Sequence, residues 1–347
     1  MKKLVLLSLL LATIATAMNA AAQSKVLNIY SARHYQTDEA MYETFTKITG
    51  IKINRVDADD AGIVARLKAE GAASPADVVL LVDAARLSGA DSQGLFMPFK
   101  SAKLDSAIPA NLRAKATSDG VTWTGFSTRA RVIVYDPLRV NAADVATYEQ
   151  LAAPKLKGLV CTRSGSHPYN LSLFSTVVER MGDANGEIWL RGMVDNMARA
   201  PKGGDTDQIK AVASGECGVA LTNTYYIARL IKSTKPEDRS VMEKVRVVFP
   251  NQGTSGTHVN IAGAAVARHS KNKDNAIAFM EFLSSAYAQD YFANGNNEFP
   301  AAKGVTVDNA ALKAMGGGKF KTEQIPLGSV AKNMVKVQQM LDRVGYK

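Results

Sequence analysis

The sequence is poor in the residues that define several protein classes. Its 347 residues include two cysteines and four histidines, and 7% of them are aromatic. Two cysteines are too few for a disulfide miniprotein or, by themselves, for a structural zinc site. The absence of any repeat period or biased run excludes collagen-like, coiled-coil and low-complexity chains. With 46% hydrophobic residues the chain is globular, and its length favours two domains.

Long apolar runs are missing except at the N-terminus, which excludes a polytopic membrane protein. There, Lys2 and Lys3 precede an apolar stretch at residues 4–17, and three alanines lie just before Gln23. This is the pattern of a secretory signal peptide over residues 1–22, and a run of about 14 apolar residues is too short to span a bilayer. No cysteine lies near the cleavage site, so we expect an exported protein without a lipid anchor.

The formal net charge is +10, and removal of the two signal lysines lowers it to +8. The basic residues are scattered and no aromatic-interleaved basic stripe occurs, so we interpret them as a solvated surface and expect no nucleic-acid partner. In an oxidising compartment, Cys161 and Cys217 are expected to form a disulfide, with two buried thiols as the alternative.

Signatures of catalysis are also absent. The sequence contains no G-x-S-x-G, H-E-x-x-H, G-x-x-x-x-G-K-[ST] or G-x-G-x-x-G motif. With only four histidines, no catalytic triad can be inferred from spacing. The sequence therefore makes no positive case for an enzyme.

Apolar runs and helical patterns alternate in two sets, which predicts parallel sheets covered by helices. The first set has predicted strands at 26–31, 51–56 and 77–82 and helices at 37–50 and 63–70. The second set has strands at 159–163, 218–223 and 245–249, with helices after Pro168, at 205–214 and from Tyr226.

Two extended segments connect these sets. Residues 122–135 cross from the first lobe to the second, residues 256–267 return, and C-terminal helices follow at 272–285 and 329–344. We therefore expect an α/β protein of two lobes that enclose a cleft. The expected lobes are 23–124 plus 256–347, and 125–255.

Tyrosines lie beyond the carboxyl ends of the predicted parallel strands, where open α/β sheets bind ligands. After the strand at 26–31, which contains Tyr30, come His34 and Tyr35. After the second-set strands come Tyr169 and the adjacent Tyr225 and Tyr226. This placement predicts a ligand site lined by phenols and one imidazole.

Phenolates are hard anionic donors, so a trivalent cation such as Fe(III) is a suitable ligand. Metal binding drives deprotonation of the phenols, so affinity should fall on acidification. Three or four phenolates would leave the bound ion neutral or at −1. Arg33, Arg131 and Arg163 are candidates by sequence position to offset this charge.

Other interpretations of the same residues stay open. Tyr30 fits a packing or hydrogen-bonding role at the end of its strand, and Tyr135 fits a structural role in the crossing segment. His167 competes with His34 for the imidazole role. The tyrosine pair could also be a stacking platform for a sugar or an amino acid.

The motifs around these residues resemble those of periplasmic ferric-iron-binding proteins of ABC-type uptake systems. The similar segments are residues 30–35 (YSARHY), 74–78 (SPADV), 164–170 (SGSHPYN) and 223–226 (NTYY). The resemblance covers essentially the whole mature chain, and the adjacent tyrosine pair is its most specific feature.

The family has two branches, and this chain resembles the tyrosine-rich one, because Tyr35 and Tyr169 are both present. The resemblance implies a ligand set drawn from both lobes: His34, Tyr35, Tyr169, Tyr225 and Tyr226. Where the other branch carries a glutamate ligand, this chain has Asp83, which we assign at most an outer role. With four phenols available, a required synergistic anion becomes doubtful.

The fold implied by the resemblance is the type II periplasmic binding protein, with two crossing hinge strands. The implied function is binding of Fe(III) in the periplasm of a Gram-negative type of cell and delivery to an ABC permease. We expect a monomer, because a delivery protein must present both lobes to the permease. A carrier of the same fold for an organic solute or an oxyanion is the alternative. An exported enzyme is a more distant one.

Overall fold

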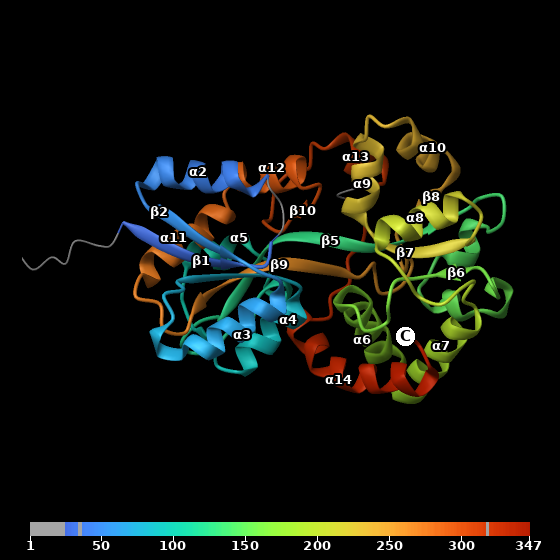
Figure 1. Cartoon of the computed structure of the whole chain (residues 1–347), viewed down its shortest axis with the longest axis horizontal. Helices are drawn as coiled ribbons and strands as arrows, with labels where there is room; N and C mark the ends of the chain where they lie inside the picture. The colour runs from blue at the N-terminus through green and yellow to red at the C-terminus, as the bar shows by residue number, and fades with distance from the viewer. Residues whose placement is uncertain (1–24, 34–36, 317–318) are drawn as a thin grey trace, which may run out of the picture.

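Two α/β lobes lie next to each other in the computed structural model, which describes residues 25–33, 37–316 and 319–347. The long strands β5 (Trp123–Tyr135) and β9 (Val259–Ala267) run between the lobes (Figure 1). The sequence-based prediction of two crossing segments at 122–135 and 256–267 is therefore confirmed.

The first lobe contains a sheet in the order β2-β1-β3-β9-β5, in which β1 pairs in parallel with β2 and β3, and β9 runs antiparallel. Its strands are β1 (Val26–Ser31), β2 (Lys52–Asp57), β3 (Val78–Val82) and the short β4 (Phe96–Met97) and β10 (Phe299–Pro300). Its helices are α2 (Asp38–Thr49), α3 (Asp60–Glu70), α4 (Ala84–Ser92), α5 (Ala102–Ala107), α11 (Lys273–Leu283) and α12 (Ala286–Gly295). The β-α-β-α-β pattern predicted from the sequence is present.

The second lobe is built on β6 (Val160–Cys161), β7 (Val219–Asn223) and β8 (Arg246–Val248). Strand β7 is parallel to β6 and antiparallel to β5. The helices are α6 (Pro168–Met181), α7 (Asp183–Asp195), α8 (Asp205–Ala213), α9 (Thr224–Lys232) and α10 (Pro236–Lys244). The strand expected at 159–163 is only two residues long, because the chain leaves the sheet edge after Cys161 and Gly165 bonds to the carbonyl of Lys347.

Strand β5 belongs to both lobes. Its residues 123–130 pair with β9, and its residues 131–135 pair with β7. All of its residues except the last are buried. The change of partner occurs between Ala130 and Arg131, so polar residues at this point lie where the two lobes meet.

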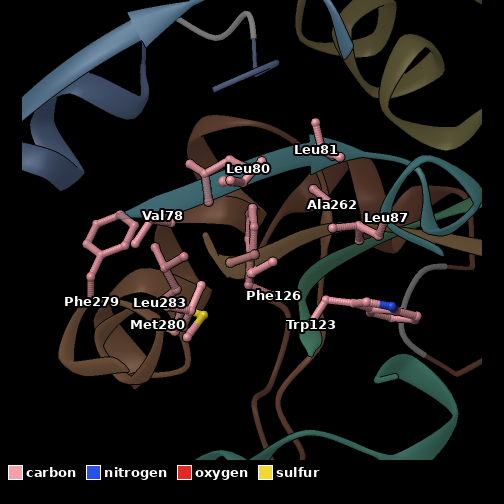
Figure 2. Packing of buried hydrophobic residues seen from close by; sticks show 14 of the residues in the cluster. Val78, Leu80, Leu81, Leu87, Trp123, Phe126, Ala262, Phe279, Met280 and Leu283 are labelled. Carbon is pink, nitrogen blue, oxygen red and sulfur yellow. The ribbon is translucent and has the colours of Figure 1, made fainter. Parts of the chain in front are cut away.

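The first-lobe core shows why its apolar runs become strands and helices. Figure 2 shows Val78 of β3 beside Phe279 of α11, with labelled residues of α4, β5 and β9 nearby. The labelled residues are Val78, Leu80, Leu81, Leu87, Trp123, Phe126, Ala262, Phe279, Met280 and Leu283. Each large apolar side chain buried in this way contributes about 1.5–3 kcal/mol.

The C-terminal helices connect the two cores. Helix α13 (Ala310–Ala314) packs with α9, and α14 (Leu327–Val344) contacts α4 in the first lobe and α6 and α7 in the second. Leu327 lies in the first-lobe core, whereas Val337 and Leu341 lie in a second-lobe core. The residue ranges expected for the two lobes stay a prediction.

The expected disulfide is present between Cys161 on β6 and Cys217 just before β7, with the two Cα atoms 5.9 Å apart. It joins neighbouring strands of the second lobe. Within the described residues, no helix combines the length and the apolar character that a membrane span requires.

Replacing Cys161 and Cys217 together by alanine should lower the free energy of unfolding by about 4 kcal/mol, because the bond closes a loop between residues 56 positions apart. Chemical denaturation of the wild type under oxidising and reducing conditions, beside the double variant, tests this. The reduced wild type should be as stable as the variant. A difference in unfolding free energy below about 1 kcal/mol between the oxidised wild type and the variant would contradict this account.

Candidate metal centre

Three tyrosines from two helix starts converge in the second lobe. Tyr169 lies in the first turn of α6, and Tyr225 and Tyr226 lie in the first turn of α9. The hydroxyl of Tyr225 donates to that of Tyr169 over 3.1 Å, and the rings of Tyr225 and Tyr226 have centroids 4.3 Å apart. We call these three residues the tyrosine platform. Their convergence follows from β6 and β7 being parallel neighbours, since both helices begin at the same sheet edge.

The platform lies against the first lobe. Ser172 of α6 donates to the carboxylate of Asp83, at 3.1 Å, and Lys232 of α9 donates to the carbonyl of Asn294 over 3.0 Å. Asp83 is fully buried at the end of β3, where it also accepts from Asn260 of β9 and caps α4. Its carboxylate thus bonds to residues of both lobes, which is consistent with a role outside the set of metal ligands.

Four guanidinium groups surround the platform. Those of Arg129, Arg131 and Arg163 lie 5.6, 6.0 and 5.2 Å from the ring centre of Tyr169. That of Arg229 lies 5.1 Å from the ring centre of Tyr225 and 5.6 Å from that of Tyr226. The site therefore presents phenols within a field of positive charge.

Arg129 differs from its neighbours because, among the described residues, no atom of its guanidinium has a hydrogen-bond partner. It is only 1% exposed. A buried cation without a hydrogen-bonded partner is costly, so this group is suited to an anion that arrives with the ligand. Burial raises the pKa of the Tyr169 phenol, whereas the charge of Arg129 opposes that rise. Arg129 therefore favours the phenolate form.

Of the arginines that the sequence nominated, Arg131 and Arg163 lie beside the platform, and both pair with Asp205. Arg33 instead pairs with Asp38 over 2.6 Å and with Glu298 over 3.3 Å, within the first lobe. His34 and Tyr35 lie outside the described residues. The structure thus brings together three of the five predicted ligands.

Tyr30 and Tyr135 take structural positions, whereas His167 lies beside the platform, with its ring centroid 4.5 Å from that of Tyr169. The hydroxyl of Tyr30 donates to the carboxylate of Glu70, and Tyr135 packs against a second-lobe core. His167 is the N-cap of α6, where its Nδ1 accepts from the backbone N–H of Tyr169 over 3.2 Å. In the described part of the chain, no three His, Cys, Asp or Glu side chains are grouped to hold a metal ion, so the donors gathered here are phenols.

Arg129 and Arg229 were not predicted from the sequence, although two local patterns indicate them. Arg129 is two residues from Arg131 on one strand, and such residues point to the same face. Arg229 follows Tyr225 by four positions on a helix, which places the two side chains next to each other.

Residues 40–315 match the model of the family described as bacterial extracellular solute-binding protein. The chain belongs to this family. It is also 43% identical to iron uptake protein A2 of Synechocystis sp., over 94% of this chain and 92% of that protein.

Solved structures agree with the family assignment. A Trichodesmium protein in complex with iron and citrate superimposes with a TM-score of 0.87 and 45% identity, covering 93% of this chain and all of that one. The ferric binding protein of Campylobacter jejuni gives a TM-score of 0.84 and 38% identity, covering 92% of this chain and all of that one. The expected periplasmic-binding-protein fold is confirmed, as is the resemblance to ferric-binding proteins.

His167 should stay uncharged across the range where histidines usually titrate. Burial and the nearby charges of Arg163 and Arg131 lower its pKa from 6.5 to about 3. Because the pKa is lower in the folded protein, its contribution to stability is complete above about pH 6.5 and is lost as the pH falls toward 3. An NMR titration of the histidine rings tests this; a His167 ring that titrates above pH 5 would contradict it.

Proposed function

We propose that this protein captures ferric iron outside the cytoplasmic membrane and delivers it to an ABC permease. The observation that carries the proposal is the tyrosine platform, in which three hydroxyl groups from two helix starts gather among four arginines. The names of its relatives support the same cargo, since they include an iron uptake protein and ferric binding proteins.

Phenolate chemistry explains how this arrangement binds the ion. Three tyrosinates neutralise the charge of Fe(III), and the surrounding arginines stabilise the deprotonated oxygens. Because burial raises the pKa of Tyr169, its phenol is protonated in the free protein, and binding must release a proton. Iron affinity should therefore decline as the pH falls, which couples release to acidity.

We assign His34 and Tyr35 as ligands from the first lobe. They follow β1, and the platform lies on the second lobe, so closure of the lobes about β5 and β9 would complete the site. Opening would remove the first-lobe ligands and leave the ion on the platform, from which it can pass to the permease.

An anion beside the ion is compatible with this site. Arg129 has donors without hydrogen-bond partners among the described residues, and a carboxylate or carbonate oxygen would satisfy them. The Trichodesmium structure contains citrate as well as iron. We therefore propose that a small anion joins when fewer than four phenolates bind.

The remaining assignments follow from the family. We propose a periplasmic location after removal of residues 1–22, an ABC permease as the partner, and a monomer as the working form. We also propose that the protein is a carrier and not an enzyme, because the family binds solutes.

The alternative is a carrier for an organic solute or an oxyanion. Arg129 and the adjacent rings of Tyr225 and Tyr226 favour it, because a guanidinium and aromatic faces can bind a planar anion without any metal. A visible spectrum separates the two functions. Tyrosinate bound to Fe(III) produces an orange-to-red charge-transfer band, whereas an organic anion leaves the protein colourless.

Tyr225→Phe and Tyr226→Phe should each weaken iron binding by more than about 100-fold, because changes outside the ligand shell alone cost about 10- to 100-fold. Titration with ferric citrate, followed by the charge-transfer band, measures this. Tyr135→Phe is the matched control, since this tyrosine packs against a core away from the platform. Equal losses in all three variants would refute the assignment.

Arg129→Gln should reduce iron affinity by about 10- to 100-fold and make binding more sensitive to acid, because the charge that favours the Tyr169 phenolate is lost. The measurement is an iron titration at several pH values, with and without added carbonate. Arg246→Gln serves as the control, because Arg246 is exposed and donates to the neighbouring carbonyls of Glu243 and Val245. Affinity that is unchanged at every pH would contradict the role of Arg129.

A further inference from the structure

We infer that Asp205 is the positioning residue of the tyrosine platform, an inference that rests on the proposed iron-binding function. Asp205 is the first residue of α8 and is fully buried. Its carboxylate is not hydrogen-bonded to any of the three platform tyrosines. It instead connects the chain segments that carry these tyrosines.

One oxygen of this carboxylate controls the start of α9. Its Oδ2 accepts the backbone N–H of Asn223 over 2.8 Å. Asn223 ends β7 and directly precedes α9, whose N-terminus has no side-chain cap. The contact therefore fixes the backbone two residues before Tyr225.

The same oxygen reaches the start of α6 through Arg131. The Arg131 guanidinium lies 2.5 Å from Oδ2 of Asp205 and donates to Oδ1 of Asn170 over 2.7 Å. Asn170 follows Tyr169 in the chain, and its own amide donates to the carbonyls of Arg163 and Ser164. The helix start that carries Tyr169 is thus tied to the helix start that carries Tyr225.

The second carboxylate oxygen of Asp205 pairs with another arginine beside Tyr169. Oδ1 of Asp205 lies 3.2 Å from the guanidinium of Arg163, which is 5.2 Å from the ring centre of Tyr169. One carboxylate therefore holds two guanidiniums, those of Arg131 and Arg163, close to the Tyr169 ring. With both oxygens occupied, Asp205 is not available as an iron ligand.

The physical consequence is a preset distance between phenol oxygens. Ligands must be held within about 0.5 Å of the productive geometry to act together, and buried charge-assisted bonds supply that rigidity. The two hydroxyls that Asp205 relates, those of Tyr169 and Tyr225, are 3.1 Å apart. Without the carboxylate, Arg131 still links the two helix starts through Asn223 and Asn170, but it loses the charged partner that fixes its position.

Asp205→Asn is the direct test, since it keeps the shape of the side chain and removes its charge. We expect a loss of iron affinity of about 10- to 100-fold and a changed charge-transfer band at saturating iron. The matched control is Asp207→Asn, which alters an exposed carboxylate in the same helical turn, one that accepts the N–H of Gly204. It should bind iron as the wild type does.

A second variant separates positioning from charge. Asn170→Ala cuts the connection to α6 without changing any charge, so positioning predicts the same change of band and a similar loss of affinity. A loss in Asp205→Asn alone would identify a charge effect and overturn the inference. Thermal unfolding verifies that each variant is folded. If Asp205→Asn does not fold, the iron affinity and band of Asn170→Ala decide whether the positioning role holds.

Two further outcomes are distinct. Folded variants that both keep the wild-type band and bind iron within about twofold of the wild type would refute the role of Asp205. A wild-type protein without a ferric band would instead refute the proposed iron function, and this inference with it.

Discussion

The pairing of β5 with two different sets of strands is the constraint on which the rest of the structure depends. Its first part is a member of the first-lobe sheet, and its second part is a member of the second-lobe sheet. Because almost the whole strand is buried, each of its peptide groups needs a partner, and the two sheets supply them. The lobes are therefore joined by paired backbone at their centre.

The crossing of β5 between the lobes also places two positive charges beside the tyrosine platform. Arg129 and Arg131 flank the point at which β5 changes partners, so both guanidiniums are buried between the lobes and beside Tyr169. Arg131 is compensated by Asp205, whereas Arg129 has no hydrogen-bond partner among the described residues. A buried cation without a hydrogen-bonded partner destabilises the iron-free protein, and it stabilises an anion that forms nearby. Deprotonation of the platform phenols on iron binding is such an event.

Local patterns in the sequence predicted the elements well and their packing less well. The strand at 26–31 and the crossing strand have the expected bounds to within a residue, because alternation and β-branched content report burial directly. Helix α14 was predicted from its helical period, but its contacts with both cores were not. A helical pattern indicates that one face is buried, but it does not indicate which elements cover that face. Asp205 looked like an ordinary acidic residue at a helix start, and only the fold surrounds it with two arginines.

Reading along the chain is enough to find that tyrosines follow strand ends, that two cysteines are available to pair, and that no catalytic motif is present. These are properties of short segments, which depend on neighbouring residues alone. Packing in three dimensions brings the hydroxyl of Tyr225 to that of Tyr169, 56 positions away, and leaves the guanidinium of Arg129 without a hydrogen-bond partner in the described part of the chain. Such long-range choices depend on how sheets and helices pack in three dimensions, and no local pattern encodes them.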